Sequence, residues 1–332
     1  MSAEQTSPHA LATAIRAGDR RALARGITLV ESSLEAHMER AHRLLDELMP
    51  FTGHAHRIGI SGTPGVGKST LIEHLGLHLT ESGGHRLAVL AVDPSSPRSG
   101  GSLLGDKTRM ERLAADERAF IRPSPSRGAL GGVARRTREA MLLCEAAGYD
   151  VIIIETVGVG QSESAVAQMV DTFLLLVQPG SGDELQGVKR GVLELCDVVA
   201  ITKADGDLQD AAKRARLDYE HGLHLLRSGE RVPVLSVSAT TGQGLDELWQ
   251  TLCSVHTMLA AGGALTERRA AQAEAWLWQA IADEQRRRFR AHTEVRARLE
   301  DVVTAVRNGA TSPEAAAGEL LAVFLGRMAG AP

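Results

Sequence analysis

Residues 58–70 read Ile58-Gly59-Ile60-Ser61-Gly62-Thr63-Pro64-Gly65-Val66-Gly67-Lys68-Ser69-Thr70. The stretch holds a glycine, four intervening residues and then Gly-Lys-Ser, which is the pattern of a phosphate-binding loop. Apolar residues from Arg57 to Ile60 predict a short strand before the loop, and the apolar spacing through 69–79 predicts an amphipathic helix after it. A strand, a glycine-rich turn and a helix in this order predict an α/β fold with a phosphate site at the turn.

The residue types of this loop indicate its chemistry. Gly65 and Gly67 allow the backbone to turn and bring N–H groups close to phosphate oxygens, and the N-terminus of the following helix adds its unpaired N–H groups. Lys68 is expected to reach the β- and γ-phosphates and to act in catalysis, and the Ser69 hydroxyl is expected to ligate Mg²⁺. The alternative is a glycine-rich turn that matches by chance, against which the strand and the helix on either side argue. The expected nucleotide-binding residues here are Gly62, Thr63, Pro64, Gly65, Val66, Gly67, Lys68, Ser69 and Thr70.

The bulk composition limits the kind of protein. The chain has 332 residues, 43% of them hydrophobic and 23% charged, as in soluble globular proteins, and its net charge of −4 gives no basic field that would favour nucleic acid. Its cysteines, Cys144, Cys196 and Cys253, lie far apart, which fits a reducing cytoplasm better than a disulfide framework. Neither a secretion signal nor an apolar run of about 18 residues is visible, so we expect a cytoplasmic protein that does not bind membranes.

The chain divides into three regions by pattern. Residues 1–53 carry apolar side chains at helical spacing and are expected to form a helical extension packed on the nucleotide domain, with a partner-docking helix pair as the alternative. Residues 54–260 alternate apolar runs with helical segments, which predicts the mostly parallel sheet, flanked by helices, of a P-loop NTPase. The expected strands span 57–60, 86–92, 149–154, 172–177, 198–202 and 234–237.

Residues 261–332 have a purely helical pattern, with helices expected over 266–307 and 314–327. This pattern is too elongated to bury itself well alone, so we expect either an arm that dimerises with a second subunit or a segment that packs on its own core. The run Arg286-Arg287-Arg288 is expected on a solvated helix face, and contact with an anionic partner is the alternative.

A loop rich in Pro, Gly and Ser follows the second expected strand and begins at Asp93. Ligands of parallel sheets bind outside the carboxyl ends of the strands, so this loop belongs to the expected active edge. Asp93 could hold Mg²⁺ or its water shell, or polarise the attacking water, and Asp106 with Lys107 could move toward the γ-phosphate. The alternative is a solvated loop in which Asp93 only caps a turn.

The third expected strand ends in an acid, Glu155, with Gly158 three residues later. This is the form of a Mg²⁺-sensing strand end, except that Glu stands where Asp is commoner, so contact through metal-bound water is expected. The Gly158 N–H would meet the γ-phosphate. Gln161 is a candidate to orient water but is offset from the usual position, so slow intrinsic hydrolysis is expected.

Thr202-Lys203-Ala204-Asp205 closes the fifth expected strand and resembles the Asn/Thr-Lys-x-Asp motif of GTPases. Asp205 would accept hydrogen bonds from guanine N1–H and N2–H₂, while adenine would leave this carboxylate unpaired. The Lys203 stem would lie over the base, and Thr202 in place of Asn would weaken the tether to the phosphate loop. Backbone N–H groups of Ser238, Ala239 and Thr240, after the sixth strand, would meet guanine O6.

Two further patterns have weaker signals. The glycine-rich stretch 179–190 follows the fourth strand, and its Lys189 and Arg190 could contact a partner or a neighbouring subunit, or simply begin a helix. Histidine pairs such as His74 with His78, and His221 with His224, have metal-like spacing but no cysteine nearby, so structural or solvated histidines are expected.

Together these motifs resemble the MeaB/ArgK family of GTPases, the accessory proteins of methylmalonyl-CoA mutase, over about residues 20–330. The stretches that carry the resemblance are Gly62-Thr63-Pro64-Gly65-Val66-Gly67-Lys68-Ser69-Thr70, Val92-Asp93-Pro94-Ser95-Ser96-Pro97, Gly105-Asp106-Lys107-Thr108-Arg109-Met110, Glu155-Thr156-Val157-Gly158-Val159-Gly160-Gln161-Ser162-Glu163 and Thr202-Lys203-Ala204-Asp205. The resemblance implies a homodimeric P-loop GTPase that binds the adenosylcobalamin-dependent mutase, gates cofactor loading, protects the mutase from inactivation and is stimulated by it. It also implies the cobalamin adenosyltransferase as a partner, and a switch segment over 178–190 with Gln178, Asp183, Lys189 and Arg190.

Two other functions compete with this interpretation. A metal-delivery maturation GTPase would need a Cys-x-x-Cys, Cys-Pro-Cys or His-rich tract beside the nucleotide site, and the sequence has none there. A kinase of a transport protein, an old label for the family, would need a base that activates the acceptor, for which Asp93 alone is thin support.

Overall fold

The structure is a computed structural model that describes residues 7–32, 34–92, 110–123, 130–156, 162–180, 190–227 and 231–326. Residues 130–133, 162 and 190 are described by their backbone only. The chain forms two compact units, Met1–Arg269 and Ala270–Pro332.

The first unit is built on a seven-stranded sheet in the order β3-β2-β4-β1-β5-β6-β7, and every pair of neighbouring strands is parallel. The strands are β1 (His56–Gly62), β2 (Leu87–Val92), β3 (Ala119–Arg122), β4 (Val151–Thr156), β5 (Thr172–Val177), β6 (Val198–Ile201) and β7 (Val234–Ser236). Most of their residues are buried, which explains why apolar runs rather than alternating patterns mark them in the sequence. The predicted α/β fold with a parallel sheet is confirmed.

The six expected strands are present with ends within two residues of the prediction, but β3 was missed. β3 has four residues, follows the charged Asp116-Glu117-Arg118 and lies at the edge of the sheet that the structure describes, where β2 is its one partner. Such a strand carries too few apolar residues to give a periodic signal. Its partner strand and the ring of Tyr149, 6.0 Å from that of Phe120, hold it in place.

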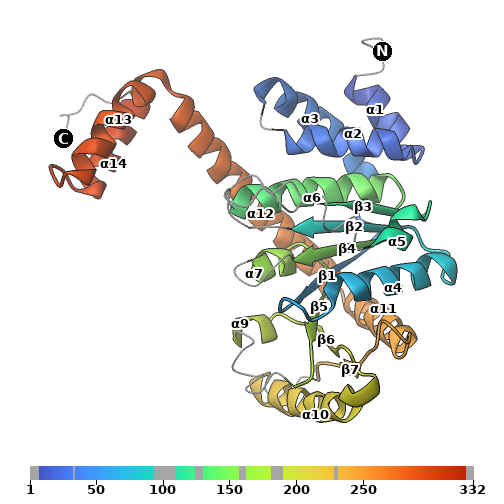
Figure 1. Ribbon diagram of the computed structural model, residues 1–332. Helices are drawn as coiled ribbons and strands as arrows, with labels where there is room; N and C mark the ends of the chain where they lie inside the picture. Colours follow the sequence, from blue (N-terminus) through green and yellow to red (C-terminus); the bar gives the residue numbers. More distant parts are fainter. Residues whose placement is uncertain are drawn as a thin grey trace. The chain divides into compact units, whose positions relative to one another are not determined.

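Helices cover both faces of the sheet (Figure 1). The helices between the strands and after the last of them are α4 (Lys68–Glu81), α5 (Glu111–Ala115), α6 (Leu130–Ala146), α7 (Ser162–Ala167), α9 (Arg190–Leu193), α10 (Gln209–Leu226) and α11 (Leu245–Ala261), with the short η3 (Gly206–Leu208). The helices α4 and α11 pack on one face in a single apolar cluster that includes Leu75, Leu174 and Leu248. The opposite face carries α6 and α7, and a side chain at Gly59 would meet Phe173 there.

The N-terminal helices α1 (Pro8–Arg16), α2 (Arg20–Glu31) and α3 (Glu35–Leu48), followed by η2 (Met49–Phe51), pack against α6 (Figure 1). Gly26 allows the close approach of α2, since a Cβ there would lie 2.9 Å from Leu143 of α6 and 2.8 Å from Ile15 of α1. The side chains of Ser7 and Asp19 accept backbone N–H groups at the starts of α1 and α2.

A buried polar network holds the amino-terminal ends of the strands. The Asp171 carboxylate is fully buried and accepts hydrogen bonds from the backbone N–H of Arg57 at 2.9 Å and from Arg269 Nε at 2.8 Å. The Arg57 guanidinium in turn donates to the buried Glu145 at 2.8 and 2.9 Å. His56 Nε2 lies 3.0 Å from Thr172 Oγ1. Each buried charge therefore has an opposite partner, as burial requires.

The second unit consists of the helices that follow. α12 (Ala264–Ala291) begins in the first unit, and α13 (Thr293–Arg307) and α14 (Pro313–Phe324) complete the chain that the structure describes. A small apolar cluster of Val295, Leu320 and Val323 joins α13 and α14, and the rings of Phe289 and Phe324 meet edge to face at 5.4 Å. None of the described helices is both long enough and apolar enough to cross a membrane.

Candidate nucleotide site

The phosphate-binding loop connects β1 to α4 and presents its backbone to open space. Gly65 and Gly67 have φ angles of +79° and +97°, in the region that favours glycine. A Cβ built at either residue would meet no described residue within 4 Å, so the described part of the chain leaves the loop open on this side. At Gly62, by contrast, a Cβ would lie 2.6 Å from the Leu176 carbonyl oxygen of β5. The loop therefore emerges from a tightly packed strand end and opens into a cradle of backbone groups.

Lys68 folds back onto the same loop. Its Nζ donates to the carbonyl oxygens of Gly62 at 2.6 Å and Thr63 at 3.2 Å, and the residue is only 9% exposed. Burial lowers the pKa of Lys68, while the carboxylates of Glu155 and Glu163 oppose the shift. The ammonium group is thus held at the loop by two carbonyl groups.

Ser69 and Glu155 come together from α4 and β4. The Ser69 hydroxyl donates to Glu155 Oε1 at 3.2 Å, and Glu155 is 4% exposed. The neighbouring Thr156 donates to Ser61 Oγ at 3.0 Å, which ties the end of β4 to that of β1. Hydroxyl and carboxylate oxygens are the donors that Mg²⁺ prefers, so the two side chains fit a magnesium ion beside the phosphate loop.

Thr202 and Lys203, at the end of β6, both reach the phosphate loop. Thr202 Oγ1 donates to the Val66 carbonyl oxygen at 2.7 Å. The threonine therefore provides a tether to the phosphate loop, which we expected to be weaker with threonine in place of asparagine. Lys203 Nζ donates to the Gly65 carbonyl oxygen at 2.8 Å and to Gln178 Oε1 at 3.0 Å. Lys203 has a φ of 54°, a conformation that costs energy in a residue with a side chain.

Asp205 is oriented by the loop that follows β7. Thr240 Oγ1 donates to Asp205 Oδ2 at 3.2 Å and lies 3.1 Å from Ser238 Oγ. Ser238 Oγ also accepts the backbone N–H of Thr241 at 3.2 Å. The two segments that the sequence assigned to base recognition therefore contact each other.

These segments enclose one cavity of about 500 Å³, a size suited to a nucleoside. The residues that line it are Val66, Gly67, Thr70, Leu71, Thr202, Lys203, Asp205, Asp207, Leu208, Val237, Ala239 and Thr240. Of these, Leu71, Asp207, Leu208 and Val237 were not expected from the sequence. The signal that could have found Asp207 and Leu208 is their position, directly after Asp205 in the loop that leaves the carboxyl end of a strand.

The structure thus brings together residues 62–70, Glu155, Gln178, Thr202, Lys203, Asp205 and the Ser238-Ala239-Thr240 segment. The expected site residues Asp93, Asp106, Gly158, Asp183 and Lys189 lie outside the described residues. Arg190 is the first residue of α9, and its side chain is not described.

The histidine pairs form no metal centre in the part of the chain that the structure describes, which holds no group of three or more His, Cys, Asp or Glu side chains suited to a metal ion. His74 Nδ1 lies 2.9 Å from the Thr70 carbonyl oxygen, and His78 Nε2 lies 2.9 Å from Asp246. The first contact lies within α4, and the second joins α4 to α11.

Residues 23–294 match the family model described as "Methylmalonyl Co-A mutase-associated GTPase MeaB". The chain belongs to the MeaB family. The GTPase ArgK of Escherichia coli is 48% identical to this chain, and the match covers 90% of this chain and 91% of ArgK. The mitochondrial methylmalonic aciduria type A homolog of Mus musculus is 47% identical, and the match covers 98% of this chain and 81% of that homolog. The family resemblance found in the motifs is therefore confirmed.

The fold of the family is also represented among solved structures. The crystal structure of a LAO/AO transport system kinase is 38% identical to this chain, covers 98% of it and 99% of its own chain, and has a TM-score of 0.73. Relatives of this chain are named GTPases, so membership of the family implies GTP binding.

Proposed function

We propose that this protein is a GTP-hydrolysing accessory protein that binds adenosylcobalamin-dependent methylmalonyl-CoA mutase, gates the loading of its cofactor and protects it from inactivation. Family membership supports the partner. The single observation that carries the nucleotide chemistry is the cavity in which the phosphate loop meets the Thr202–Asp205 segment and the Ser238-Ala239-Thr240 segment.

Guanine selection rests on Asp205 in this proposal. The hydrogen bond from Thr240 holds the carboxylate at the cavity, where it accepts the guanine N1–H and N2–H₂ groups. The Lys203 stem lies over the base, and backbone N–H groups of Ser238, Ala239 and Thr240 bind O6. An adenine base would leave the carboxylate without donors, which is a large cost at a partly buried site.

Phosphate binding rests on the loop and on Lys68. When GTP binds, the β- and γ-phosphate oxygens replace the carbonyl oxygens of Gly62 and Thr63 as acceptors for Lys68. Ser69, Glu155 and, from the sequence, Asp93 are the residues that would hold Mg²⁺, which neutralises charge on the phosphate oxygens. Asp106 and the Gly158 N–H are assigned to the γ-phosphate on sequence grounds.

Communication with the mutase rests on the segment that begins at Gln178. The side chain of Gln178 contacts Lys203, so the base motif and the start of this segment are linked. We assign Asp183, Lys189 and Arg190 to the partner contact, and the cobalamin adenosyltransferase to the same cofactor route. Intrinsic hydrolysis is expected to be slow and to be stimulated by the mutase in the cytoplasm.

The C-terminal region 261–332 is assigned to homodimerisation. Its α12 exposes large apolar side chains, with Leu277 58% and Trp278 63% exposed, which supports a covered surface in the assembled protein. Sedimentation of a chain that ends at Ala261 should give a monomer. An unchanged dimer, or a monomeric parent protein, would contradict the assignment.

The nucleotide part is tested by calorimetry with GTP and Mg²⁺. We expect Asp205→Asn to lose GTP and gain xanthosine triphosphate, whose N1 and C2 groups complement an amide. The matched control is Asp207→Asn, a neighbouring acid that lines the same cavity and should keep the preference for GTP. Equal GTP affinity in Asp205→Asn and the parent protein would refute the assignment.

The partner is tested by co-purification with methylmalonyl-CoA mutase, with and without a non-hydrolysable GTP analogue. Because a solved relative is titled a transport system kinase, transfer to protein is the competing chemistry. Label from the γ-phosphate of GTP should pass to water in our proposal. Label found on protein would favour the kinase.

A further inference from the structure

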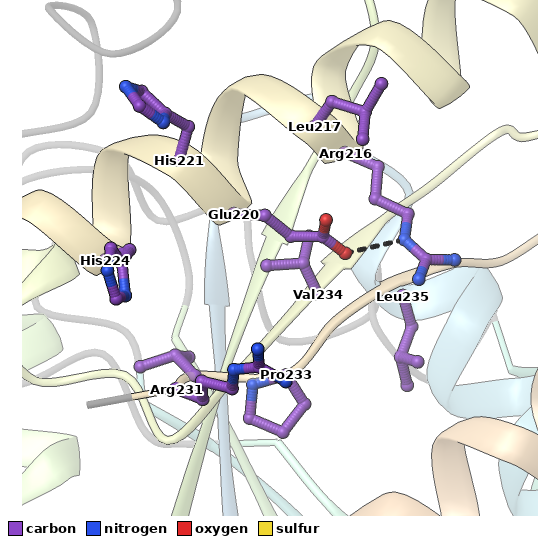
Figure 2. Close-up of a pocket in the computed structure, with 10 residues that line it drawn as sticks. Arg216, Leu217, Glu220, His221, His224, Arg231, Pro233, Val234 and Leu235 are labelled. Atoms are coloured by element: carbon purple, nitrogen blue, oxygen red, sulfur yellow. Dashed lines mark hydrogen bonds and ion pairs between the residues drawn. The ribbon is translucent and has the colours of Figure 1, made fainter. Parts of the chain in front are cut away.

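A second hollow, of about 730 Å³, lies at the far edge of the sheet between α10 and the chain that enters β7 (Figure 2). It shares no residue with the nucleotide cavity. Its lining residues on α10 are Arg216, Leu217, Glu220, His221 and His224, whose spacing places them on one face of the helix. The opposite wall is formed by Arg231, Val232, Pro233, Val234 and Leu235. Nothing in the proposed GTPase function uses this hollow.

The strand at this hollow has an open edge. β7 is the last strand of the sheet and pairs only with β6 among the described residues. On that side, Pro233 accepts a hydrogen bond from Val199 and Val237 donates one to Ile201, at 2.9 and 2.8 Å. Because backbone groups alternate along a strand, those of Val232 and Val234 point to the open side, whereas the Ser236 carbonyl oxygen is covered by Gly244, where a Cβ would lie 2.5 Å from it. This edge is a template for a further strand.

The side chains around this edge include more basic than acidic groups, beside apolar ones. Glu220 is the one acid among the lining residues, and Arg216 Nε donates to it at 2.9 Å (Figure 2). Arg231 is exposed and has no ion pair within the described chain, and two histidines add donors nearby. Leu217 is 64% exposed beside them. The surface therefore combines an apolar strip with an excess of basic groups.

We propose that this hollow docks an extended acidic segment of a partner protein, which adds as a strand to the open edge of β7. The main-chain groups of Val232 and Val234 would give the affinity, as in β-strand addition. Alternate acidic side chains of the segment would face Arg216 and Arg231, and the side chains between them would point to the opposite face of the added strand. The edge explains why the occupant is extended, and the arginines explain why it is acidic.

The test uses the full-length protein and a fluorescein-labelled peptide of about ten residues that alternates Val and Glu, long enough to span a strand. Fluorescence anisotropy should show saturable binding. We expect Arg216→Glu with Arg231→Glu to weaken it at least about tenfold. The matched control is Arg214→Glu, an exposed arginine of α10 outside the hollow, which should bind as the parent does. GTP binding should be unchanged in all variants, so folding is monitored independently.

A second measurement separates strand addition from simple charge attraction. Two versions of the peptide carry N-methyl groups on alternate backbone amides. One version is methylated on the amides of the edge that faces β7, and the other on the amides of the opposite edge. Only the version that loses the donors facing β7 should bind at least about tenfold more weakly. Equal affinity of both versions, equal affinity of a Val-Lys peptide, full competition by phosphate alone, or no binding up to about 1 mM peptide would each overturn the proposal.

Discussion

Acidification should destabilise the first unit through His56, and this effect can be calculated. His56 is 8% exposed, and its Nε2 lies 3.0 Å from Thr172 Oγ1. Burial lowers the pKa of His56 from 6.5 to about 3, and the nearby His256 adds to the shift while Asp171 opposes it. The imidazole is therefore neutral in the folded protein at any pH near neutrality.

The sign follows from the two protonation states. The unfolded chain binds a proton at His56 near pH 6.5, whereas the folded protein binds it only near pH 3, so acid favours the unfolded state. Stability from the neutral imidazole is fully present above pH 6.5 and is lost as the pH falls toward 3. Between about pH 7 and pH 5, this single group should lower the free energy of unfolding by about 2 kcal/mol.

The assay is urea unfolding at both pH values, followed by the fluorescence of Trp249, whose ring lies 6.0 Å from that of His56. Substituting Trp276 and Trp278 by Phe makes Trp249 the sole reporter, and it belongs to the first unit. In this background, the free energy of unfolding should differ between pH 7 and pH 5 by about 2 kcal/mol less in His56→Gln than in the parent.

The control is His42→Gln, at an exposed position of α3, which should retain the pH dependence of the parent. Asp171 contributes little in this range. Although burial raises its pKa, hydrogen bonds from Arg269 lower the pKa of the carboxyl overall, and His256 Nε2 at 3.7 Å adds to the shift. The stability that the charged carboxylate contributes is therefore lost only in stronger acid. An unchanged pH dependence in His56→Gln would refute the reasoning.

Four further predictions concern the nucleotide site. Lys68→Ala should lower the rate of phosphate release from GTP by at least about 100-fold, and full hydrolysis in this variant would show that another loop is active. Thr202→Val removes the hydroxyl that donates to Val66 at 2.7 Å and should weaken GTP binding by about 1–2 kcal/mol in calorimetry; an unchanged affinity would mean that the tether is irrelevant. Gln178→Ala removes a partner of Lys203 and should reduce the nucleotide dependence of mutase binding while GTP affinity changes less than about threefold; a loss of GTP binding instead would place Gln178 in the cavity. Removal of Mg²⁺ by chelation should weaken GTP binding more than GDP binding, and equal effects would exclude a metal contact to the γ-phosphate.

Much of the fold could be predicted because buried parallel strands are apolar along their whole length. The run Ile152-Ile153-Ile154, for example, is a strand in any context that buries both faces. β3 could not be predicted in this way, since its order depends on pairing with Leu87–Leu90 of a strand distant in sequence. The same holds for Asp171, whose Arg269 partner lies almost a hundred residues later.

The parts of the candidate site also differ in how far a local sequence pattern predicts them. Residues 62–70 and Asp205 belong to local patterns, the phosphate-loop pattern and the Thr-Lys-x-Asp pattern, so the sequence alone predicts their roles. The link between Gln178 and Lys203 has no local pattern. It exists because β5 and β6 are neighbours in the sheet, which places the residues after Val177 and Ile201 side by side.

Lys203 is the residue at which these contacts converge. Its left-handed backbone conformation costs about 1–3 kcal/mol in a residue with a side chain, and such strain persists only where the surroundings over-determine it. Its Nζ donates to the Gly65 carbonyl oxygen of the phosphate loop and to Gln178 Oε1, at the start of the segment assigned to the partner. The adjacent Thr202 donates to the Val66 carbonyl oxygen. A base that lies against the Lys203 stem must therefore act on the phosphate loop and on Gln178 together. The strain at Lys203 is therefore held by contacts to the phosphate loop and to Gln178 at once.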